Sequence, residues 1–170
     1  MKMYRMIGAA VLALSALAVG CDDDNDPLAP DLPTSFTASL TGGAERPPIT
    51  STATGTATFT VNTDGTIAYT VRVANLGTNV TLCHIHLARP DISGGVLVTL
   101  CGNAVTGPIT TEQIIATGTI IQGQNTGLNS TPTTLLSLRE LMASGSLYVN
   151  VHSTAVGSGE IRGNIVPVTP

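Results

Sequence analysis

The sequence contains no tryptophan, and aromatic residues make up only 3% of it. Surfaces that bind sugars or single-stranded nucleic acids commonly stack aromatic rings on their ligands, so this composition argues against both classes. Charged residues are also scarce, at 11%. From Thr34 onward five arginines face six acidic residues. Such a near-neutral balance lacks the basic surface that nucleic-acid binding requires.

The only lysine, Lys2, stands with Arg5 in front of an apolar run from Met6 to Val19. A basic start, a short apolar run and a small residue, Gly20, are typical of a secretion signal, and the run is short for a membrane span. Residues 17–21, Leu-Ala-Val-Gly-Cys, resemble a bacterial lipobox, in which the cysteine becomes the lipidated N-terminus. We therefore predict a lipoprotein signal peptide over residues 1–20 and lipidation of Cys21. A secretory peptide with an incidental cysteine is the alternative.

An acidic, proline-rich segment follows over residues 21–33. Repelling charges and prolines disfavour regular pairing, so this segment is predicted to be a tether. It would hold a domain over residues 34–170 away from the membrane that Cys21 enters. The protein would then be extracytoplasmic, on the periplasmic side or on the cell surface, and these two locations stay open.

The remaining cysteines, Cys83 and Cys101, form an even pair. Outside the cytoplasm such pairs commonly form disulfides, and one is predicted here. Two buried free thiols are the alternative.

Alternating apolar and polar residues predict an all-β domain. Asp64-Gly65 between two such runs is typical of a hairpin turn. Short strands at even intervals favour an antiparallel Greek-key β-sandwich or barrel. One segment, near 132–144, has helical spacing instead, with Thr131 able to cap it and Gly145 able to end it. The predicted strands cover residues 34–41, 52–62, 66–75, 80–88, 95–101, 116–122, 146–152 and 159–166.

All three histidines lie in two of these strands. His84 and His86 are two positions apart, so both imidazoles project from one face with Cα atoms about 6.5–7 Å apart, while Cys83, Ile85 and Leu87 are expected in the core. If His152 lies on the neighbouring strand, the three rings can converge on copper or zinc. Glu160 or Asp91 would then be an oxygen ligand.

The alternative is a polar network in which the histidines bond to loop backbone or to Glu160, with Asn150 and Arg162 as further members. Polar groups that are partly buried need such mutual partners. Catalysis is not expected and no catalytic residue is assigned: the sequence has no G-x-S-x-G motif, and Cys83 and His84 point to opposite faces of their strand.

Several motifs together resemble the CHRD domain family, named from chordin and found in many bacterial secreted proteins and lipoproteins. They are His84-Ile85-His86, the stretch Tyr148–His152 and the stretch Gly159–Gly163, with Glu45-Arg46-Pro47-Pro48 near the start. The resemblance covers about Thr34 to Val166. It implies an extracytoplasmic β domain that binds or supports other molecules, with no agreed enzymatic activity.

The histidine pattern also resembles a fragment of copper/zinc superoxide dismutase, which pairs H-x-H with a later V-H on a Greek-key barrel. This chain has no fourth histidine for the copper and no further histidine to bridge a second metal. We therefore expect a lipid-anchored binding or structural module of the cell envelope with an unidentified ligand and no nucleic-acid partner. A copper- or zinc-binding envelope protein of dismutase-like fold is the alternative.

Overall fold

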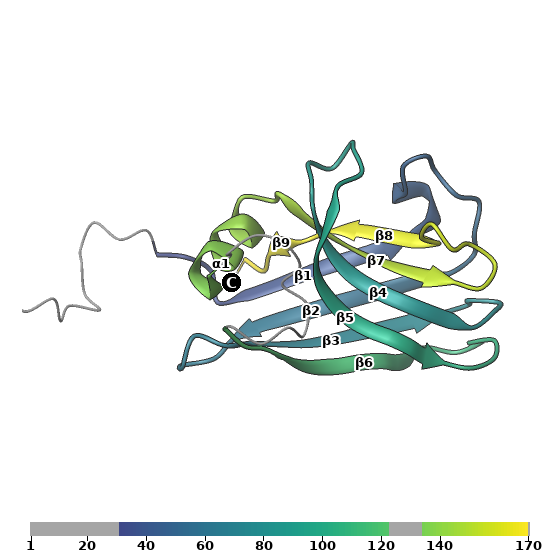
Figure 1. Ribbon diagram of the computed structural model, residues 1–170, viewed down its shortest axis with the longest axis horizontal. Coiled ribbons are helices and arrows are strands. Elements are labelled where there is room, and N and C mark those ends of the chain that lie inside the picture. The colour runs from purple at the N-terminus through teal and green to yellow at the C-terminus, as the bar shows by residue number, and fades with distance from the viewer. Residues whose placement is uncertain (1–30, 123–133, 170) are drawn as a thin grey trace, which may run out of the picture. The chain divides into compact units, whose positions relative to one another are not determined.

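The computed structural model describes residues 31–122 and 134–169. They form nine strands, one α-helix and a short 3-10 helix, η1 (Figure 1). The elements are β1 Ser35–Thr41, η1 Gly42–Ala44, β2 Thr54–Val61, β3 Ile67–Ala74, β4 Val80–Leu87, β5 Gly95–Val105, β6 Gln113–Ile120, α1 Leu135–Ala143, β7 Leu147–Ser153, β8 Ile161–Asn164 and β9 Val166–Pro167.

The strands form one antiparallel sheet in the order β5-β4-β7-β8-β1-β2-β3-β6, with β9 paired to β1. The sheet curls into a nearly closed barrel (Figure 1). Across the gap between its two ends, the Tyr69 hydroxyl of β3 donates to the Leu100 carbonyl of β5 at 2.9 Å. The predicted all-β antiparallel fold with one short helix is confirmed.

The barrel encloses the core because inward positions alternate along each strand. In β1 the buried side chains are Phe36, Ala38 and Leu40, while the intervening residues are polar and at most partly covered. The neighbouring β2 repeats the pattern with Ala57 and Phe59. Period-two burial on adjacent strands is what fixes their register.

Helix α1 lies at one end of the barrel, next to β9 (Figure 1). Its Leu138 and Met142, one turn apart, are both fully buried. The N-terminal cap of the helix is Thr134, whose hydroxyl accepts a hydrogen bond from the Ser137 backbone N–H at 3.1 Å. The predicted cap, Thr131, lies outside the described residues. Gly145 follows the helix with φ of 68°, a conformation that favours glycine.

The last predicted strand, over 159–166, is in fact divided into β8 and β9. Ile165 between them is fully buried, and its backbone N–H bonds to the Leu147 carbonyl at 2.9 Å. Before this residue the chain pairs with β7, and after it the chain pairs with β1. A period-two pattern does not reveal this change of partner.

Candidate functional site: a histidine cluster beside a buried glutamate

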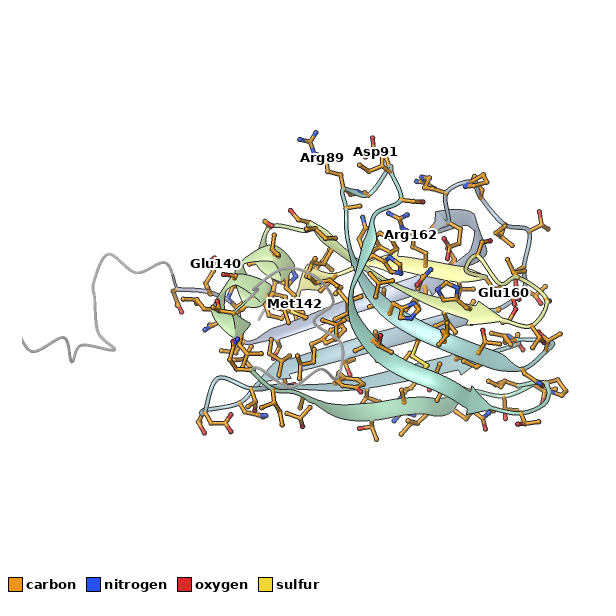
Figure 2. The ribbon with its side chains drawn as sticks, viewed as in Figure 1. Arg89, Asp91, Glu140, Met142, Glu160 and Arg162 are labelled. Carbon is orange, nitrogen blue, oxygen red and sulfur yellow. A yellow bond between two sulfur atoms is a disulfide. The ribbon has the colours of Figure 1, made fainter. Side chains whose placement is uncertain are left out.

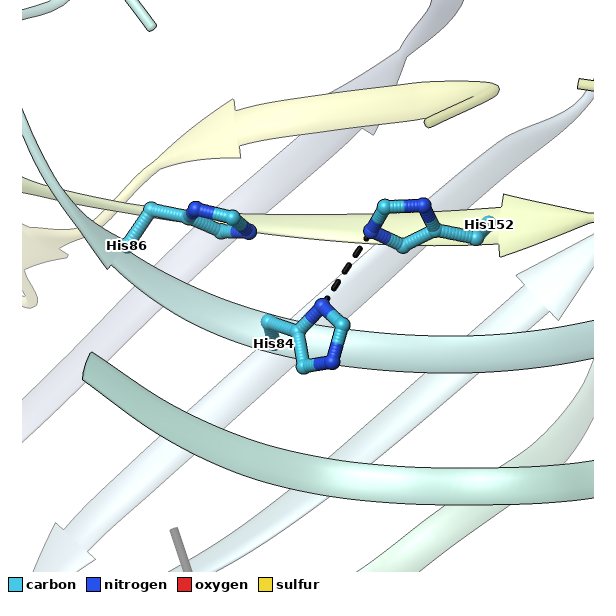
Figure 3. A group of neighbouring side chains, drawn as sticks. All are labelled: His84, His86 and His152. Atoms are coloured by element: carbon cyan, nitrogen blue, oxygen red, sulfur yellow. Dashed lines mark hydrogen bonds between the residues drawn. The ribbon is translucent and has the colours of Figure 1, made fainter. Parts of the chain in front are cut away.

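The neighbouring strands β4 and β7 bring the three histidines together. Their antiparallel register pairs Leu82 with His152, His84 with Asn150 and His86 with Tyr148. The three imidazoles therefore lie on one face of the strand pair (Figure 3). One ring nitrogen of each lies within 4.8 Å of the others, and this is the metal-ligand cluster found in the described residues.

His84 and His152 are in direct contact, with His84 Nδ1 3.2 Å from His152 Nε2 (Figure 3). The other nitrogen of His152, Nδ1, lies 2.9 Å from the Gly157 carbonyl. A carbonyl only accepts, so Nδ1 of His152 carries a proton, and with one proton on each ring Nε2 of His152 accepts from Nδ1 of His84. This pair is thereby fixed in one tautomeric arrangement.

Burial lowers the pKa of His84 to about 4, and the nearby His152 and His86 add to the effect. The side chain is 8% exposed, and removal of water disfavours the charged form. His84 is consequently neutral near physiological pH, which is the state that can ligate a metal.

His86 is held at both ring nitrogens. Nδ1 lies 3.0 Å from the Gly94 carbonyl and Nε2 3.0 Å from Oδ1 of Asn150. An imidazole with one proton can donate at only one nitrogen, so the second contact requires either a further proton or a 180° rotation of the Asn150 amide. Burial lowers the pKa of His86, and the hydrogen bonds to Gly94 and Asn150 oppose this.

Tyr148 is stacked between His86 and Arg162, which come from the strands on either side of β7. Its ring is 4.8 Å from that of His86 and nearly parallel to it. The Arg162 guanidinium carbon lies 3.4 Å from the Tyr148 ring centre, a close cation–π contact. Arg162 also donates from Nη2 to the carbonyls of the loop before β5, namely those of Arg89, Pro90 and Ile92. The stack therefore fixes this loop over the outer face of β7.

The structure separates Glu160 from the histidines. Its carboxylate accepts from the Ser51 hydroxyl at 2.7 Å and from Ser153. Asp91 is exposed on the loop before β5 and points away from the barrel (Figure 2). Of the residues assigned to a polar network from the sequence, Asn150 contacts His86 and Arg162 contacts Tyr148, whereas Glu160 belongs to a serine cluster of its own.

The burial of two parts of these strands does not follow from the alternation of residues. Tyr148 and Asn150 of β7 are each only 3% exposed, because loops lie over that face. Leu87 was expected in the core, but it is 43% exposed. It is the last residue of β4, and the β4–β5 register shifts between Ile85 and His86.

Glu45 is the residue that sequence reasoning missed. It is 6% exposed, and burial raises its pKa, against the lowering effects of Arg162 and the Asn150 amide. The only signal in the sequence was the Glu45-Arg46-Pro47-Pro48 turn. Nothing local indicates that this turn folds over β7.

Cys83 and Cys101 form a disulfide between β4 and β5, where they are paired in register with Cα atoms 4.9 Å apart. Both sulfurs are thus placed beneath the histidine face, since Cys83 points inward and is fully buried.

Comparison with known proteins identifies the family. No helix in the described part of the chain is long and apolar enough to span a membrane. A search of curated proteins finds no match. The model of the CHRD domain, however, matches residues 36–165, which cover β1 to β8 apart from Ser35. The chain therefore belongs to the CHRD domain family, whose domains are extracellular binding or structural modules.

Proposed function

We propose that the protein is a lipid-anchored binding module of a bacterial cell envelope. The observation that carries this proposal is the position of Cys21, directly after the apolar run and within Leu-Ala-Val-Gly-Cys. These residues lie outside those that the structure describes, so the anchor rests on the sequence. The Cys83–Cys101 disulfide supports an oxidising compartment.

Detergent phase partitioning tests the anchor. The wild type should enter the detergent phase, and Cys21→Ser should move to the aqueous phase because it has no thiol to lipidate. Asn25→Ser, four positions later, is the matched control and should behave as the wild type. Wild type and Cys21→Ser both in the aqueous phase would refute the anchor.

A second function, binding of one copper or zinc ion, is favoured by a specific observation: the approach of three imidazoles to within 4.8 Å. Tetrahedral zinc with bonds of about 2.05 Å places its ligand nitrogens about 3.3 Å apart. The His84–His152 separation of 3.2 Å already meets this requirement. Binding there requires that the proton on His84 move from Nδ1 to Nε2 and that the two rings turn so that both lone pairs point at the ion.

His86 can be the third ligand of the metal site only after a rearrangement. Its Nε2 is engaged by Asn150, so an ion has to displace the amide before this ring can ligate. The three ligand nitrogens are spread over up to 4.8 Å, which is more than two bonds of about 2.05 Å can span. Inward movement of one ring is therefore part of binding, and His84 and His152 form the first half of the site.

Calorimetric titration with Cu²⁺ and with Zn²⁺ tests this second function. We expect about one equivalent per chain, bound more tightly than about 10 μM, and a higher melting temperature with metal. His152→Ala should abolish binding, whereas Thr154→Ala, exposed on the adjoining turn, should not. Should the histidines be structural instead, no such binding occurs and His152→Ala costs about 1–3 kcal/mol through unpaired partners.

A further inference from the structure

A cavity of about 190 Å³ lies next to the histidine cluster. We name it the Glu45 pocket. Its walls come from the turn after η1, from the two loops before β5 and β8, and from β4 and β7. The lining includes Glu45, Pro47, His86, Tyr148, Asn150 and Gly159.

The pocket contains a buried carboxylate oxygen without a partner. Oε1 of Glu45 has no hydrogen-bond partner in the described residues, although the residue is 6% exposed. Gly159 keeps the space beside this oxygen open, since a Cβ there would lie 2.6 Å from it. An unpaired buried acceptor is costly, and this one belongs to a side chain that lines the cavity.

The charges around the pocket restrict what can bind. The free oxygen needs a donor, and a cationic donor best compensates a buried carboxylate. Arg46 is exposed and lines the same pocket, so the pocket has a positive charge at its edge. Arg162 also carries unpartnered nitrogens, but its guanidinium is held against the Tyr148 ring. The Arg46 guanidinium already donates from Nη1 to the carbonyls of residues 43–45, and its charge still favours an anionic or acceptor group nearby. A ligand with an ammonium group at one end and an oxygen acceptor at the other therefore complements both Glu45 and Arg46.

We propose that the Glu45 pocket binds the α-amino group of an amino acid, free or at the amino terminus of a peptide, with the ammonium on Glu45 and the neighbouring oxygen toward Arg46. The volume suits one small residue, and Pro47 and Ile49 supply an apolar wall. This inference rests on the proposed binding function and gives the module a class of ligand.

Titration of the full-length chain in detergent with defined probes tests the inference. The probes are L-alanine, N-acetyl-L-alanine and the tripeptide Ala-Ala-Ala. Amide NMR signals of Gly94 and Gly159 report on the pocket in the wild type, independently of any variant. L-Alanine or the tripeptide should shift these signals saturably, and N-acetyl-L-alanine should not, because it has no ammonium group. Preference for L-alanine indicates a free amino acid, and preference for Ala-Ala-Ala indicates a peptide terminus.

Glu45→Gln keeps the side-chain shape and removes the charge, so it should weaken binding by about tenfold or more. Glu112→Gln, a change at an exposed carboxylate paired with Arg72, should have no effect. Equal binding of N-acetyl-L-alanine, or unchanged binding by Glu45→Gln, would overturn the inference. So would the absence of saturable shifts up to about 10 mM probe, as expected if a trapped water satisfies Glu45. These outcomes leave the anchor test at Cys21 and the metal test at His152 unaffected.

Discussion

Acidification should destabilise the folded domain through His84. Burial lowers the pKa of this side chain from 6.5 to about 4, so between these values the unfolded chain binds more protons than the folded one. Stability therefore rises with pH in this window. The contribution of His84 is complete above 6.5 and is lost progressively as the pH falls toward 4.

The size of the effect follows from the two pKa values. Between about pH 7 and pH 5, His84 alone should remove about 2 kcal/mol from the free energy of unfolding. Burial also lowers the pKa of His86, which acts in the same direction. The raised pKa of Glu45 acts in the opposite direction, because the folded chain then holds the extra proton. The wild type thus reports a sum, and the share of His84 has to be isolated by substitution.

Urea denaturation at about pH 7, 6 and 5, with a chelator present, measures this difference. His84→Gln can still donate to His152 but does not titrate, so its stability should fall by about 2 kcal/mol less than that of the wild type. Leu82→Gln, an exposed change on the same strand, should retain the wild-type slope. An identical loss of stability in the wild type and in His84→Gln would refute the reasoning.

Three further predictions concern the supports of the site. Cys83→Ala opens a loop of 18 residues and should cost about 3 kcal/mol; titration of two thiols in the unreduced, denatured wild type would contradict this. Arg162→Met removes the bonds to three loop carbonyls and should cost about 2–3 kcal/mol, with faster amide exchange at Ile92; unchanged exchange would contradict it. Gly159→Ala introduces a Cβ 2.6 Å from Glu45 Oε1 at a φ of 120° and should cost about 1–3 kcal/mol of stability, measured by a thermal melt. The control Gly77→Ala, at a position with open space around it, should cost less.

The parts of the fold that the sequence could predict are those fixed by local patterns. Phe36, Ala38 and Leu40 alternate with polar residues, and this alternation predicts β1 because one face of the strand meets the core. The Asp64-Gly65 hairpin was also predictable from its own residues, since glycine accepts the φ of 80° found there. In each case the neighbours that determine the structure lie within a few residues.

The covered face of β7 could not be predicted, because the segments that cover it are distant in the chain. Tyr148 and Asn150 have the polarity of an exposed face, and only the turn at Glu45 and the loop before β5 make them buried. For the same reason the histidine spacing indicated convergence but did not reveal that Asn150 occupies one nitrogen of His86. Nor did it indicate that Glu160 bonds to Ser51 and Ser153 instead of Arg162.

The polar groups over the outer face of β7 cost folding free energy that strands with a purely structural role would not need to lose. Burying Glu45, His86 and Arg162 removes strongly hydrated groups from water, and three atoms of this set, Glu45 Oε1 and Arg162 Nε and Nη1, have no partner in the described residues. Apolar side chains of similar size hold two strands together without that loss. The polar face is better explained as a surface kept ready for a ligand, with Arg162 and Tyr148 holding the loop that bonds His86 in place. His86 and Asn150 are common to both sites, but His152 does not line the Glu45 pocket, so variants at His152 and at Glu45 test the two kinds of binding separately.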